Sequence, residues 1–113
     1  MKLHEIVEKL SLKVWTENAD LDSDVKTGYA SDLLSDVMAN ALEGSLWVTL
    51  QVHQNIVAVA VLKSLSGIVF VNGREPEEAT LKKANEEGLA IMTTELSMFE
   101  VVGRLYGLGV AGS

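Results

Sequence analysis

The sequence predicts an α/β fold, a three-layer-like domain with a mainly parallel central sheet and helices on both faces. From residue 25 onward, short apolar stretches alternate with helix-like stretches in the order β-α-β-α-β-α-β-α. Short, fully apolar strands separated by helices are typical of parallel sheets that are covered on both faces. The 113 residues, 48% of them apolar and 22% charged, suit a single domain with its own core.

The N-terminal residues predict a helix followed by a short strand. Apolar residues occur at the i, i+3, i+4 and i+7 spacing of an amphipathic helix at Leu3, Ile6, Val7 and Leu10. Alternation over Leu12–Trp15 indicates a strand, and the polar, acidic stretch Thr16–Asp24 indicates a loop.

The regular alternation begins with a short strand over Val25–Thr27 that ends at Gly28. Ser31 or Asp32 is expected to cap the next helix, since a short side-chain oxygen accepts from the free amides of a first turn. The buried stripe of that helix is expected at Leu33, Leu34, Val37, Met38 and Ala41. Leu46–Leu50 then predicts a strand and His53–Asn55 a turn.

The segment Ile56–Leu65 fits either a buried strand or a helix that is buried on most sides. We predict a helix, because Gly67–Val71 directly after it is a better strand. A ten-residue strand ending at Gly67 would leave no room for the crossover between parallel strands.

The C-terminal third predicts a helix, a strand and a second helix. Pro76 suits the first helical position, and Gly88 ends that helix. Leu89–Met92 predicts a strand, Leu96–Tyr106 the last helix, and Gly107–Ser113 a flexible tail.

Composition excludes several classes of function. A net charge of −7 opposes binding to phosphate backbones, so we expect no nucleic-acid partner. The longest apolar run has seven residues, far fewer than the roughly 20 of a membrane span. The chain has no cysteine, which excludes disulfides and cysteine-bound clusters within it. With no export signal at the N-terminus, we expect a cytoplasmic protein without a resident metal or cofactor.

The predicted parallel sheet gathers polar loops at one edge. Small-molecule sites in open α/β sheets lie beside the carboxyl ends of the strands. The residues that follow the strands form the candidate ligand site: Gly28, Ser31, Asp32, His53, Asn55, Asn72, Gly73, Arg74 and Thr94. Arg74 supplies a forked donor for an anion. Turn and capping chemistry uses the same residue types and is the alternative interpretation.

The last helix predicts self-association. Its apolar residues cover most of its circumference, more than one face of a small sheet can bury. We expect a homodimer whose contact stripe is formed by Met98, Val101 and Leu105. The alternative is that the first helix packs on this stripe and completes a monomer.

Several segments resemble DRTGG-domain proteins, over residues 25 to 106. The resemblance rests on residues 27–41, 44–49, 53–60, 72–76 and 93–94, although the string DRTGG itself is absent. It implies one DRTGG-like domain over residues 1–113, related to the non-catalytic N-terminal domain of HPr kinase/phosphorylase. Stand-alone members of the family tend to be encoded near iron hydrogenase components.

Together these features predict a non-catalytic regulatory or protein-interaction module that binds a small anionic ligand or nucleotide at the strand edge. One alternative is an accessory protein of an iron hydrogenase or another redox system, which rests on the resemblance alone. The other alternative is a small enzyme that uses the same edge, with His53 or Asp32 as acid or base and Arg74 as anion anchor. The sequence offers no convincing nucleophile or metal-binding set, so no residue is assigned as catalytic.

Overall fold

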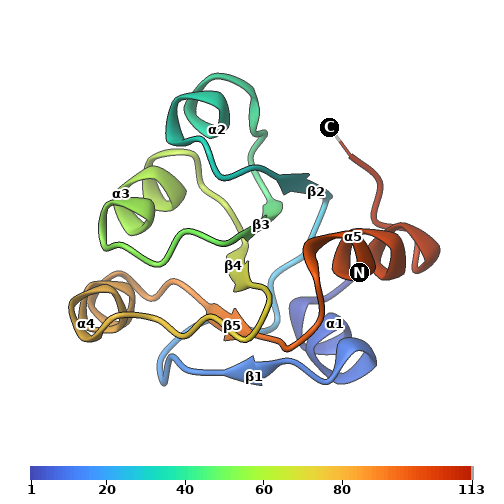
Figure 1. Ribbon diagram of the computed structural model, residues 1–113, viewed down its shortest axis with the longest axis horizontal. Coiled ribbons are helices and arrows are strands. Elements are labelled where there is room, and N and C mark those ends of the chain that lie inside the picture. The colour runs from blue at the N-terminus through green and yellow to red at the C-terminus, as the bar shows by residue number, and fades with distance from the viewer. Residues whose placement is uncertain (113) are drawn as a thin grey trace.

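A five-stranded sheet forms the middle layer of the computed structural model, which describes residues 1–112 (Figure 1). The strands are β1 (Lys13–Val14), β2 (Thr27–Ala30), β3 (Ser45–Thr49), β4 (Gly67–Phe70) and β5 (Ile91–Thr93). The helices are α1 (Leu3–Leu10), α2 (Leu34–Asn40), α3 (Asn55–Leu62), α4 (Glu78–Glu87) and α5 (Met98–Gly107).

The sheet is mainly parallel, as the sequence predicts. Its strand order is β1-β5-β4-β3-β2, and β2, β3, β4 and β5 run parallel to one another. Only β1 is antiparallel, with Lys13 opposite Thr93. The carboxyl ends of the four parallel strands therefore lie at one edge, which confirms the α/β fold class.

Helices cover both faces of the sheet. Figure 1 shows α1 and α5 on one face and α2, α3 and α4 on the other. Alternate strand residues serve the two layers: Leu46 and Val48 join the core under α1 and α5, whereas Trp47 joins the core under α2, α3 and α4.

The ambiguous apolar segment Ile56–Leu65 is a helix as predicted, but the helix ends at Leu62. In α3, Ile56 and Val57 are fully buried, while Val61 and Leu62 are exposed. The helix thus covers one face of the sheet and leaves its outer side in solvent.

The prediction that the first parallel strand ends at Gly28 is wrong. Pairing continues through Gly28 and Tyr29 to Ala30, opposite Val48. Gly28 does not end the strand because its backbone amide donates outward to the Ala111 carbonyl at 2.9 Å.

The predicted caps of α2 and α4 are also wrong. Leu33 is the N-cap of α2, without a side-chain hydrogen bond. Glu77 is the N-cap of α4, so Pro76 lies one residue before the cap rather than at the first helical position. Gly88 does end α4, with a φ of 69°.

Part of the predicted stripe of α2 faces solvent. Leu33 is 63% exposed and Met38 37% exposed, whereas Val37 and Ala41 are buried. Leu34 is partly buried and packs against the same core, so three of the five predicted positions attach this seven-residue helix to the sheet.

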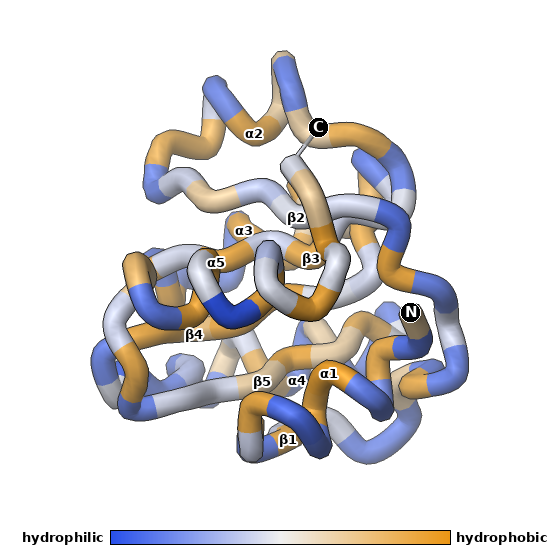
Figure 2. The backbone as a smooth tube through the Cα atoms, turned by 90° about the vertical axis from the view of Figure 1, so that its right-hand side faces the viewer, coloured by the Kyte–Doolittle hydropathy of each residue, from blue (hydrophilic) through white to orange (hydrophobic). Residues whose placement is uncertain are grey.

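The predicted dimer stripe on the last helix is wrong. Val101 and Leu105 are buried in the same core as Leu3, Ile6 and Leu10 of α1, and Met98 packs against that core. The first helix therefore covers the stripe, and Figure 2 shows α1 and α5 on the same side of the sheet. These side chains are not available to a second copy.

Residues 110–112 contact β2. Val110 is 6% exposed, and the Thr27 hydroxyl donates to the Ala111 carbonyl at 2.7 Å. Gly112 forms a parallel bridge with Gly28. Where the sequence predicts a flexible tail, the structure gives this segment specific contacts; Ser113 lies outside the described residues.

Within residues 1–112 no helix is long and apolar enough to cross a membrane.

Candidate functional site

The chain changes faces of the sheet between two neighbouring strands. The segment after β4 leads to α4 on one face, and the segment after β5 leads to α5 on the other (Figure 1). Open α/β sheets bind ligands at such a switch point, because the two diverging loops leave a crevice between them.

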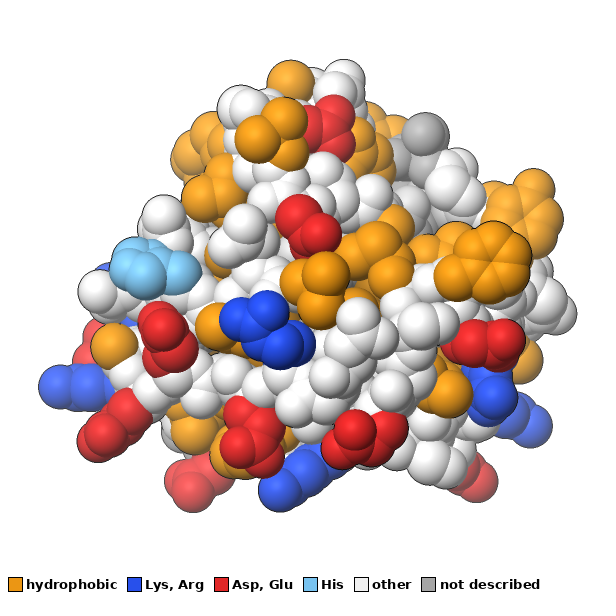
Figure 3. Space-filling model, in the orientation of Figure 1, with side chains coloured by type: hydrophobic (Ala, Val, Ile, Leu, Met, Phe, Trp, Pro, Cys, Tyr) orange, Lys and Arg blue, Asp and Glu red, His pale blue; other side chains and the backbone are white. Residues whose placement is uncertain are grey.

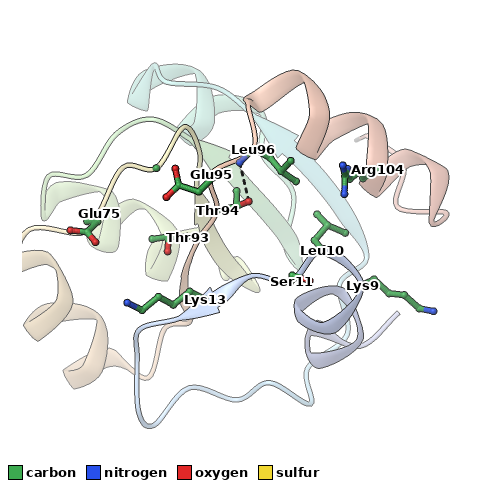
Figure 4. Close-up of a pocket in the computed structure, with 11 residues that line it drawn as sticks. Lys9, Leu10, Ser11, Lys13, Glu75, Thr93, Thr94, Glu95, Leu96 and Arg104 are labelled. Carbon is green, nitrogen blue, oxygen red and sulfur yellow. Dashed lines mark hydrogen bonds between the residues drawn. The ribbon is translucent and has the colours of Figure 1, made fainter.

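A cavity of about 490 Å³ lies at this point, at the carboxyl end of β5. We call it the switch-point cavity; its lining residues are Lys9, Leu10, Ser11, Lys13, Gly73, Glu75, Thr93, Thr94, Glu95, Leu96 and Arg104. Figure 4 shows that they come from α1, β1, the two diverging loops and α5. The volume is within the usual range for a small-molecule site.

Backbone hydrogen bonds hold the two diverging loops together. The amide of Asn72 donates to the Leu96 carbonyl and that of Gly73 to the Thr94 carbonyl, both at 2.9 Å. The loop turns through two residues with positive φ, 57° at Asn72 and 70° at Gly73. Glycine at position 73 serves this turn, since other residues rarely adopt a φ of 70°.

Basic side chains gather around the switch-point cavity although the chain is acidic. Lys9, Lys13 and Arg104 line it together with only two carboxylates, Glu75 and Glu95. In Figure 4 the long side chains of Lys9 and Lys13 extend away from the centre. Both residues are exposed, so burial does not hold either ammonium group in its position.

Two of these cations have weak partners in the chain itself. Lys13 Nζ lies 4.1 Å from the centre of the Trp15 ring, and Arg104 Nε lies 3.6 Å from Glu100 Oε2. Exposed contacts of this kind are worth at most about 1 kcal/mol. An anion in the cavity can therefore recruit either cation at small cost.

Hydroxyl groups supply the polar part of the wall. Thr93 is buried, and its hydroxyl accepts from Trp15 Nε1 at 2.8 Å. The hydroxyl of Thr94 accepts from the Leu96 amide at 3.1 Å. Thr94 is only partly buried, so its hydroxyl retains a proton for donation to a ligand.

The structure brings only part of the sequence-predicted site to this cavity. Gly73 and Thr94 line it, and Asn72 fixes its loop. Arg74 is exposed and lies between two lining residues without lining the cavity itself. Gly28 instead lines a second, mostly apolar cavity of about 330 Å³ between β2 and α5.

The remaining predicted residues have local partners at the same edge. Asp32 Oδ1 accepts from the Thr49 hydroxyl at 2.8 Å and from the Leu50 amide at 2.7 Å. Ser31 Oγ accepts from the Leu33 amide, and the His53 ring is hydrogen-bonded to the Asn55 side chain. The Ser31 and His53 contacts are the turn chemistry of the alternative interpretation, whereas the Asp32 contacts join the segment after β2 to the segment after β3.

A tyrosine–aspartate pair connects β2 and α2, away from the switch-point cavity. The Tyr29 hydroxyl donates to Asp36 Oδ2 at 2.8 Å. This hydrogen bond raises the pKa of Tyr29 and, with a second bond from Asn40, lowers the pKa of the Asp36 carboxyl. Both shifts hold the groups in their usual protonation states at neutral pH, which opposes a role in proton transfer.

The sequence patterns do not predict most of the residues that line the switch-point cavity. Lys9, Ser11 and Lys13 reach it because β1 pairs with β5 and α1 packs beside α5. The available signal was two lysines four residues apart, on either side of the first helix end, in an otherwise acidic chain. Among residues 1–112 no cluster of three or more His, Cys, Asp or Glu side chains could hold a metal ion.

Comparison with solved structures shows what this fold is similar to. The CBS and DRTGG domains of the regulatory region of Clostridium perfringens pyrophosphatase, solved with the activator diadenosine tetraphosphate, match with a TM-score of 0.77. The match covers 97% of this chain and 47% of that one, at 16% identity. No family model and no curated protein matches the sequence. The chain thus spans about half of the matched regulatory region and has a DRTGG-related fold.

Proposed function

We propose that the chain is a non-catalytic regulatory module that binds a small anionic ligand of the nucleotide class in the switch-point cavity. The observation that carries this proposal is the gathering of Lys9, Lys13 and Arg104 around a cavity at the switch point of an acidic chain. The related fold of a regulatory region that was solved with a dinucleotide activator supports the nucleotide class.

A ligand in this cavity would touch elements that are far apart in the sequence. Ser11 follows α1, Thr94 follows β5 and Arg104 belongs to α5. Contacts to all three would strengthen the packing of α1 against α5 when the ligand is bound. A regulatory module needs such a link, because a ligand shifts a conformational equilibrium only through contacts that differ between the two states.

The homodimer that the sequence predicts remains a proposal, on a different surface of α5 from the predicted one. Nothing among residues 1–112 favours an accessory role beside an iron hydrogenase, or a small enzyme, over a regulatory role.

Thermal unfolding with added ligand tests the proposal. The panel is ATP, ADP, AMP, diadenosine tetraphosphate and inorganic phosphate, and a ligand at a hundred times its dissociation constant stabilises the folded state by about 2.7 kcal/mol. We expect Lys13→Ala and Arg104→Ala each to weaken binding roughly threefold to tenfold, as for loss of an exposed charge-assisted contact.

The matched control is Lys82→Ala, an exposed lysine on α4 that does not line the cavity. Its affinity should equal that of the unchanged chain. An equal loss of affinity in all three variants would show that binding depends on the net charge of the chain and not on this cavity, which would contradict the proposal. The proposal would also be contradicted if no ligand of the panel stabilised the chain.

A further inference from the structure

Helix α5 carries a second apolar stripe, on the side that faces away from the core. Phe99 is 86% exposed, Val102 39% and Tyr106 68%, and the i, i+3, i+7 spacing places them on one face. Figure 3 shows hydrophobic side chains gathered along α5 on this side of the molecule. We call these three residues the outer stripe. Exposed aromatic groups in one patch are typical of an interaction surface.

Two glycines border the outer stripe: Gly103 lies one turn after Phe99, and Gly107 lies one turn after Gly103. A Cβ added at Gly103 or Gly107 would meet no atom within 4 Å, and neither residue has a positive φ. The folded chain itself therefore does not require glycine at either position. Glycine in the middle of a helix costs about 0.5–1 kcal/mol relative to alanine, so Gly103 calls for another reason, whereas Gly107 is the last residue of α5. They leave shallow hollows beside the two aromatic side chains.

Opposite charges flank the outer stripe. Glu100 and Arg104 are about half exposed and lie one turn apart. Consider a second α5 that packs antiparallel to the first, related to it by a two-fold axis at the height of Gly103. Residue 100 of one helix is then offset from residue 104 of the other by two residues, which is about 3 Å measured along the helix axis. Glu100 of each copy then lies near Arg104 of the other, so the dimer contains two such pairs of opposite charge.

The same operation matches the apolar parts. With the axis at Gly103, Phe99 lies level with Gly107 of the second copy, and the two Gly103 residues face each other. A large side chain is thus placed against a hollow at both ends of the contact. The apolar cavity between β2 and α5, which Val102 and Tyr106 also line, extends this surface on one side.

We propose that α5 pairs with α5 of a second copy in an antiparallel, two-fold dimer through the outer stripe. A two-fold contact needs a single self-complementary patch, and this helix face brings aromatic groups, hollows and both charges in matching order. Phe99, Gly103 and Gly107 do not line the switch-point cavity, so variants at these positions test the dimer apart from the ligand; Arg104 alone belongs to both surfaces.

Sedimentation equilibrium of the full, ligand-free chain tests the dimer. We expect a dimer mass, and we expect Phe99→Asp and Gly103→Gln each to raise the dissociation constant at least about tenfold. Gly103→Gln is the sharper variant, because it fits the monomer, favours the helix and fills the contact. Circular dichroism should show that it unfolds no more easily than the unchanged chain.

The matched control is Ala58→Gln, at an exposed position of α3 beside the exposed Val61 and Leu62. It should leave the dimer intact. A second test exchanges charges: Glu100→Arg and Arg104→Glu should each weaken the dimer at low salt, and the double exchange should restore it. A chain that stays monomeric at high micromolar concentration, or a dimer that Gly103→Gln does not affect, would overturn the proposal.

Discussion

Asp32 joins two loops at the edge of the sheet. The sequence suggests a helix cap or a ligand contact, but Oδ1 of this carboxylate accepts from the hydroxyl of Thr49 and the amide of Leu50. These donors belong to the end of β3, so no pattern local to residue 32 could indicate them. The side chain holds the segment after β2 against the segment after β3.

Removal of this carboxylate should therefore destabilise the fold. We expect Asp32→Ala to lower the free energy of unfolding by about 1–2 kcal/mol, since two hydrogen bonds to a charged but exposed acceptor are lost. Urea denaturation measures the change. Glu8→Ala, which removes an exposed carboxylate of α1 that has no bond of this kind, should stay within about 0.5 kcal/mol. Equal losses in the two variants would show that the Asp32 contacts contribute nothing.

The Tyr29–Asp36 pair predicts a pH dependence. The raised pKa of Tyr29 means that its contribution is lost as pH rises through that pKa, above about 10. The lowered pKa of Asp36 means that its contribution is lost as pH falls through that pKa, below about 4. The pair should therefore stabilise the fold fully between these limits.

Comparison of the unchanged chain with Tyr29→Phe across pH tests this behaviour. The difference in melting temperature should be constant near neutral pH and shrink at both extremes. In the Tyr106→Phe background, Tyr29 is the one remaining tyrosine, so its ionisation can be followed by ultraviolet absorption. A Tyr29 that titrates at or below the value of a free tyrosine would contradict the hydrogen bond to Asp36.

At the scale of the elements, apolar patterns predicted the type of nearly every helix and strand. The patterns work because strands in the middle of a covered parallel sheet are largely apolar, as Ile68 to Phe70 are. They fail at ends and edges. Gly28 continues β2 because residues 110–112, from the other end of the chain, lie beside it.

The docked C-terminal segment should contribute to stability. Val110→Ala removes two buried methyl groups and should cost about 1.5–2.5 kcal/mol, from about 0.8 kcal/mol for each buried carbon group plus the cavity that remains. Val102→Ala, the same change at a half-exposed position of α5, should cost less than about 0.5 kcal/mol. Denaturant unfolding compares the two variants. If Val110→Ala were as stable as the unchanged chain, the C-terminal segment would be flexible and the prediction would be contradicted.

At the scale of the whole molecule, the sequence could predict the edge of the sheet that carries the site but not the cavity. Parallel strands bring their carboxyl ends together, so Gly73 and Thr94 could be found from their positions alone. Lys9 and Lys13 belong to the cavity only because β1 pairs antiparallel with β5 at the end of the sheet. That pairing is a property of the complete fold.

The first helix also decides what α5 presents to solvent. It covers Val101 and Leu105, the residues that an apolar pattern alone assigns to a dimer. What stays exposed is the opposite face with Phe99 and Tyr106. A helix that is apolar on two faces leaves both interpretations open until its neighbours are known.

The central claim is that a small anionic ligand binds in the switch-point cavity, and backbone amide NMR during a nucleotide titration tests it most directly. The account predicts saturable shifts confined to the cavity lining, including Ser11, Lys13, Gly73, Thr94 and Glu95. The opposite edge of the sheet, around Gly44 and Ser66, supplies an internal control and should not change. Shifts centred on that opposite edge, or no saturable shift with any nucleotide at millimolar concentration, would contradict the account.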